Sequence, residues 1–86
     1  MTEILIPEFV EFMPEEKEEG ILYISEKFSL AIHKCPCGCG YDSVLPIGPN
    51  GWMMTNENNE ISFVPSILNK WCSSHFYITK NKIVWC

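Results

Sequence analysis

Short stretches of alternating hydrophobic and polar residues make up most of this chain, and turn-forming residues separate them. The stretches are rich in β-branched and aromatic residues, which fit a pleated sheet. None shows the period of about 3.6 residues that a long helix requires. The pattern predicts an all-β domain with a mostly antiparallel small sheet or meander. The predicted strands are residues 21–25, 29–34, 41–47, 52–55, 60–64, 75–79 and 82–85.

The first twenty residues are less regular. Residues 3–12 are expected to form an edge strand or two short extended pieces, because Pro7 cannot donate a hydrogen bond within a central strand. Residues 13–20 can form one short helical turn, with Pro14 near its start and Gly20 at its end. We expect at most this one turn of helix here.

Turn signals organise the second half of the chain. The sequences "GPNG" and "NENN" mark turns at residues 48–51 and 56–59, and a hairpin is expected around residues 80–81. Residues 65–71, "PSILNKW", are too short to be more than a helical turn or loop. We find no repeat or linker, so residues 1–86 are expected to form a single domain.

Length and composition add a constraint on stability. The chain has 86 residues, of which 47% are hydrophobic and 20% charged, a globular composition. A domain of this size buries only about 60 to 65% of its unfolded surface, so a metal, disulfide or partner commonly stabilises it. The start of the chain resembles no signal peptide, and no apolar run is long enough to span a membrane. We therefore expect a cytoplasmic protein with no membrane association.

The charge balance bears on the partner. The formal net charge is −5, with many acidic residues between Glu8 and Gly20. Nucleic-acid-binding proteins normally present a basic surface, so a nucleic-acid partner is disfavoured and a protein partner is expected. A small basic patch could still form from Lys70, Lys80 and Lys82, although solvated lysines at strand ends and turns are the favoured interpretation.

Cysteine and histidine residues form the most informative motif, "HKCPCGCGYD". Its three cysteines lie too close together for unstrained disulfides, and the total of five is odd. Strand alternation places His33 and Cys35 on one face. Gly38 and Gly40 can adopt positive φ angles, as a tight metal-binding knuckle of the zinc-ribbon type requires. A metal site is therefore predicted.

A second pair of donors, Cys72 and His75, follows about thirty residues later. Structural zinc sites take four thiolate or imidazole ligands, usually from two separated pairs. Six side chains compete for the four places, and we expect one zinc ion held by Cys37, Cys39, Cys72 and His75. Cys35 could replace a knuckle cysteine, and His33 could be a ligand, a hydrogen-bond partner of a thiolate or a packed strand residue. Metal removal should unfold much of the domain.

Catalysis is an alternative to a purely structural site. A cysteine–histidine dyad could form from Cys35 with His33, or from Cys72 with His75. No nucleophile elbow, phosphate loop or carboxylate pair accompanies them, and no open zinc site can be identified. We therefore expect a binding protein rather than an enzyme. Cys86 is interpreted as a frayed terminal thiol.

Several ordered motifs resemble, from about Gly20 onward, a family of small bacterial and phage proteins of unknown function. They are "EEGILYIS", "AIHKCPCGCG", "LPIGPNGW", "SFVPSI" and "WCSSHFYI…KIVW". Asn50 replaces the threonine of the family's turn, and "LNKW" departs from its usual sequence. The motif residues are His33, Cys35, Cys37, Gly38, Cys39, Gly40, Gly51, Trp52, Pro65, Ser66, Ile67, Cys72, Ser74 and His75.

The resemblance implies a zinc-binding β domain. Some members are encoded near ubiquitin-like modifiers and their activating, conjugating and isopeptidase-like enzymes, in conjugation or anti-phage operons. Together with the residue analysis, this favours a zinc-binding protein-interaction or adaptor domain. The alternatives are a zinc-ribbon-like nucleic-acid-binding protein and a zinc- or cysteine-dependent hydrolase. The sequence specifies neither the partner nor the oligomeric state.

Overall fold

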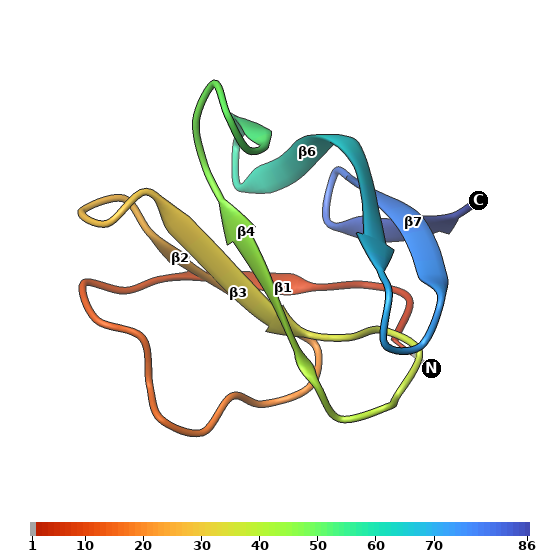
Figure 1. The fold of residues 1–86 in the computed structure, drawn as a ribbon. Coiled ribbons are helices and arrows are strands. Elements are labelled where there is room, and N and C mark those ends of the chain that lie inside the picture. Colours follow the sequence, from red (N-terminus) through yellow and green to blue (C-terminus); the bar gives the residue numbers. More distant parts are fainter. Residues whose placement is uncertain (1) are drawn as a thin grey trace.

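The computed structural model describes residues 2–86 and contains two four-stranded sheets (Figure 1). The prediction of an all-β fold is confirmed. Within the described residues no helix could cross a membrane. The first sheet consists of β1 (Ile6–Phe9), β2 (Ile21–Ser25), β3 (Leu30–Lys34) and β4 (Asp42–Pro46), in that order. The second consists of β5 (Met53–Glu57), β6 (Glu60–Asn69), β7 (Ser74–Thr79) and β8 (Lys82–Trp85), also in that order.

All neighbouring strands within the two sheets pair antiparallel except β1 and β2, which are parallel. The edge position predicted for the strand that contains Pro7 is confirmed, because β1 is the first strand of its sheet. Before β1, the chain pairs with the other sheet: Ile83 donates its N–H to Glu3, and Leu5 donates to Asn81. The N-terminal segment thus connects the two sheets.

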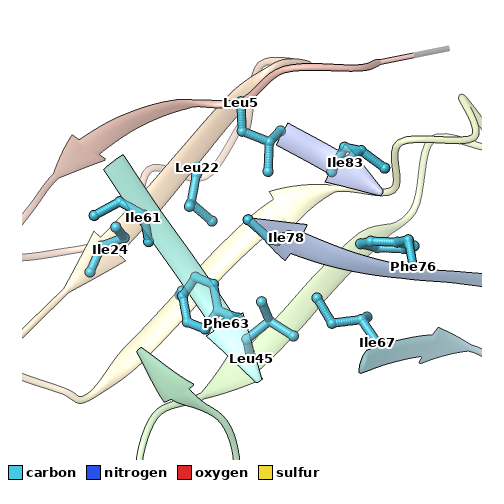
Figure 2. Packing of buried hydrophobic residues seen from close by; sticks show 11 residues of the cluster. Leu5, Leu22, Ile24, Leu45, Ile61, Phe63, Ile67, Phe76, Ile78 and Ile83 are labelled. Carbon is cyan, nitrogen blue, oxygen red and sulfur yellow. The ribbon is translucent and has the colours of Figure 1, made fainter. Parts of the chain in front are cut away.

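The core lies between the inner faces of the two sheets (Figure 2). Alternation along each strand explains it, because every second side chain points inward. On β6, for example, Ile61 and Phe63 are inside while Glu60 is exposed. The buried cluster comprises Leu5, Leu22, Ile24, Ala31, Leu45, Ile61, Phe63, Ile67, Phe76, Ile78 and Ile83.

Two local predictions are wrong. Residues 13–20 form no helical turn; Glu18 N–H donates instead to the Tyr23 hydroxyl, which holds this acidic segment against the first sheet. Residues 65–69 are not a loop but the second half of β6, paired with β7. Pro65, which lacks an N–H, is accommodated where the β6–β7 register shifts between Phe63 and Ile67.

The predicted hairpin turn at residues 80–81 is confirmed. Lys80 and Asn81 have φ angles of 48° and 68°, and Asn58 and Asn59 in the β5–β6 turn have 52° and 67°. Positive φ at both central residues is the hallmark of the two-residue turn that matches the twist of a β-hairpin. These two turns form the β5–β6 and β7–β8 hairpins.

Candidate metal centre and serine–histidine pair

Four cysteines meet at one end of the two-sheet structure. Cys35 follows β3, Cys37 and Cys39 lie in the loop before β4, and Cys72 lies in the turn between β6 and β7. Their sulfur atoms all lie within 4.8 Å of one another. Figure 1 shows the yellow-green loop after β3 beside the blue turn after β6. The two loops that the sequence separates by about thirty residues therefore form one cluster.

The distances within this cluster suit a metal better than a disulfide. The Cys35 sulfur lies 3.4 Å from that of Cys37 and 3.5 Å from that of Cys72. A disulfide bond is about 2.05 Å long. Ligands at a zinc–sulfur distance of about 2.3 Å in a tetrahedron stand about 3.8 Å apart. The four cysteines could therefore hold a metal ion.

Glycines shape the knuckle, as the sequence predicts. Gly38 and Gly40 have φ angles of 90° and 89°. Gly38 donates its N–H to the Cys35 carbonyl, and Cys35 donates to Tyr41 across the loop. The positive φ angles let Cys35, Cys37 and Cys39, which alternate with other residues along the chain, direct their sulfur atoms toward one point.

Polar side chains from β6 and β7 contact the sulfur atoms. Asn69 Nδ2 donates to the sulfur of Cys35 at 3.3 Å. The Ser74 hydroxyl oxygen lies 3.1 Å from the sulfur of Cys72. Burial raises the pKa of the Cys35 thiol to about 11, whereas a hydrogen bond with Ser74 lowers the pKa of Cys37 to about 6. The lowered pKa of Cys37 favours its thiolate, the form that binds metals.

His33 is placed in the core rather than among the sulfur atoms. Its side chain is fully buried, its Nδ1–H donates to the Lys34 carbonyl at 2.8 Å, and its ring meets the Phe76 ring edge-on. Burial lowers the pKa of His33 to about 4, so the ring is neutral at physiological pH. Of the roles left open by the sequence, the packed strand histidine describes this geometry.

His75 points to a different partner. Its Nε2 lies 2.8 Å from the hydroxyl oxygen of Ser66, on the exposed face of the second sheet. His75 is on β7, opposite Leu68, and Ser66 lies in β6 where the register shifts. With the imidazole proton on Nδ1, Nε2 accepts the serine proton, and the separation is that of a nucleophile and its base.

The structure thus regroups the six predicted ligands. It brings together Cys35, Cys37, Cys39 and Cys72, whereas the preferred set from the sequence contained His75 in place of Cys35. Cys86 is exposed at the end of the chain, and its N–H donates to the His75 carbonyl. Sequence analysis includes Ser66 only as part of the "PSI" motif. Its pairing with His75 follows from the β6–β7 register, which places Leu68 opposite His75 and Ser66 two residues before Leu68, and no local sequence signal gives that register.

Comparison with known proteins gives one match. A family model described as "Bacterial ubiquitination-like system serine protease (BubE)" matches residues 9–86. No curated protein and no solved structure matches the chain. The matched range includes all four clustered cysteines and the serine–histidine pair.

Proposed function

The chain belongs to the BubE family of bacterial ubiquitination-like systems, and we propose that it is a serine protease with Ser66 as nucleophile and His75 as general base. The observation that carries the proposal is the 2.8 Å contact between Ser66 Oγ and His75 Nε2. This contact lies on an exposed face that a polypeptide can reach. The family description names a serine protease, which supports a serine as the nucleophile.

The two side chains supply the chemistry of acyl transfer. Ser66 Oγ attacks the scissile carbonyl carbon while its proton passes to His75 Nε2. His75 then donates that proton to the leaving nitrogen as the carbon–nitrogen bond breaks, which leaves an ester on Ser66. Water attacks the ester and gives a proton to His75, and the ester oxygen takes one back. The products are an amine and a carboxylic acid, with the serine restored.

The substrate we propose is a bond at the C-terminal tail of a ubiquitin-like modifier. We propose that this tail is joined to another group through its terminal carbonyl, so that a protease would release either a precursor extension or a conjugated target. Both bonds present the same carbonyl to Ser66. The proposal rests on the family description and on the acyl-transfer geometry together.

We further propose that Cys35, Cys37, Cys39 and Cys72 bind one zinc ion. Zinc bound by four thiolates has no open coordination position, so it supplies cross-linking rather than catalysis. Cys72 lies in the turn between β6 and β7, and Ser74 is the first residue of β7, directly before His75. The cross-link would therefore hold the general base in place through its own strand.

Catalysis replaces the adaptor role as the favoured interpretation. An adaptor would present a recognition surface but would need no hydroxyl beside an imidazole. The acidic charge balance still argues against a nucleic-acid partner, and the metal-dependent or cysteine-dependent hydrolase gives way to one that uses serine. The adaptor and protease hypotheses differ in one measurable respect, the reactivity of Ser66.

Labelling with a fluorophosphonate, followed by peptide mapping, tests this proposal without any knowledge of the substrate. We expect the reagent to modify Ser66, because His75 removes its proton during attack. Ser62 is an internal control on the same strand, since its hydroxyl accepts a hydrogen bond from the Lys80 N–H and has no base beside it.

Two variants make the labelling result specific. His75→Ala should lose the modification, and Thr79→Ala, which alters an exposed hydroxyl residue on the same strand as His75, should keep it. An unmodified Ser66, or equal labelling of Ser66 with and without His75, would refute the protease proposal.

A further inference from the structure

Strand β6 extends well beyond the strand that precedes it. It has ten residues, whereas β5 has five, and their pairing ends at Met53 opposite Val64. From Pro65 to Asn69, β6 has β7 on one side and, among residues 2–86, no strand on the other. An inner strand of the sheet thus becomes an edge strand over its second half. Ser66 lies within this half.

The backbone of Leu68 faces the open side. The carbonyl of His75 accepts the N–H of Cys86, at 3.0 Å, so the backbone groups of His75 face away from β6. Because backbone groups alternate in direction along a strand, those of Phe76 face β6 and pair with Ile67. The next pair, Leu68 and His75, therefore exchanges no backbone hydrogen bonds. Within residues 2–86 no backbone hydrogen bond outside the strand pairing reaches Leu68. Its N–H and C=O are free to pair with another chain.

The surroundings of this edge are apolar and adjoin the catalytic pair. Val64 and Leu68 flank Ser66 along β6 and are 52% and 54% exposed, and Tyr77 beside them is 40% exposed. Leu68 lies two residues beyond Ser66, which is about 7 Å along a strand. A chain that paired with Leu68 would therefore pass within one or two residues of the nucleophile.

We propose that the substrate binds as an extended strand along this open edge, in line with β5, and exchanges backbone hydrogen bonds with Leu68. The occupant is an unstructured polypeptide segment with uncharged side chains around the scissile bond, such as a protein tail. Such strand addition provides affinity through the main chain and selectivity through neighbouring apolar side chains. This inference rests on the proposed serine protease function, because a strand bound at this edge would place its scissile bond beside Ser66.

Backbone amide hydrogen exchange by NMR tests the inference. The probe is a synthetic peptide with the sequence of the C-terminal tail and following residues of a ubiquitin-like protein from a bacterial ubiquitination-like system, added to the Ser66→Ala variant to prevent turnover. We expect exchange of the Leu68 amide to slow by about tenfold or more on saturation, since a new hydrogen bond protects it. The Ile67 amide, which already faces Phe76, should not change and is the matched control.

A second measurement examines the peptide. N-methylation of the one amide that pairs with Leu68 should lower kcat/KM by about tenfold or more, whereas N-methylation of its two neighbours should have little effect. Unchanged exchange at Leu68, or protection at the outer edge of β5 or β4 instead, would overturn this docking site. Fluorophosphonate labelling of Ser66 reports on the nucleophile alone, so failure of the docking site and failure of the protease are distinguishable.

Discussion

If the proposed function is correct, replacement of Ser66 by alanine is expected to lower kcat for cleavage of the proposed ubiquitin-like substrate by at least about a thousandfold, with the fold unchanged. Ser66 would lose the only atom that forms the acyl intermediate. The folded structure would lose one hydrogen bond on an exposed face, to His75. Circular dichroism and the cleavage rate, measured on the same sample, check both parts of this expectation.

The same loss is expected for His75→Ala, and combining both substitutions should add little, because the two side chains act as a unit. Thr79→Ala is the matched control and should retain full activity. If Ser66→Ala kept its activity while Cys37→Ser lost activity with the fold intact, the chemistry would belong to the cysteine cluster and the serine assignment would be wrong.

Metal removal is expected to unfold the domain. Zinc binding to structural sites contributes about 10 to 16 kcal/mol, whereas small domains are stable by only about 5 to 15 kcal/mol. The cluster joins the loop after β3 to the turn after β6, so its loss would separate the two sheets at that end. We expect about one zinc per chain before treatment with a strong chelator, and loss of the β-sheet circular dichroism signal after it.

Single substitutions identify the ligands. Cys35→Ser, in the buried member of the cluster, should lower zinc content and stability, whereas Cys86→Ser should alter neither, because Cys86 is exposed and outside the cluster. His75→Gln should retain one zinc if the four cysteines are the ligands, and should lose it if the set preferred from the sequence is correct. Release of the metal with no change in circular dichroism would argue against a structural role.

Strand positions could be predicted from the sequence because they depend on local alternation and local turns. The positive φ angles of Gly38 and Gly40 could likewise be predicted from the residue type alone. The hairpin at residues 80–81 could be predicted from the local turn sequence. The second half of β6 could not be found this way. Its strand conformation depends on pairing with β7 across a register shift, which outweighs the local effect of Pro65.

The roles of the two histidines also depend on distant contacts. Beside Cys72, His75 looks like a fourth ligand, since zinc sites often combine cysteine with histidine. In the structure, alternation along β7 turns Ser74 inward and His75 outward, toward Ser66 on the neighbouring strand. His33 shows the reverse case, because the packing of Phe76 from the second sheet makes it a core residue. The different surroundings of the two histidines therefore arise from the packing of the two sheets and not from the local sequence.

The N-terminal segment that pairs with β8 has a consequence for where the domain can be cut. The family match begins at residue 9, yet Leu5 is 1% exposed and belongs to the core. Loss of such a side chain costs about 2 to 5 kcal/mol, and loss of residues 3–5 would also uncover the edge of β8. A protein trimmed to the matched range should therefore be unstable and prone to edge-to-edge aggregation, so the smallest autonomous unit starts upstream of the family boundary.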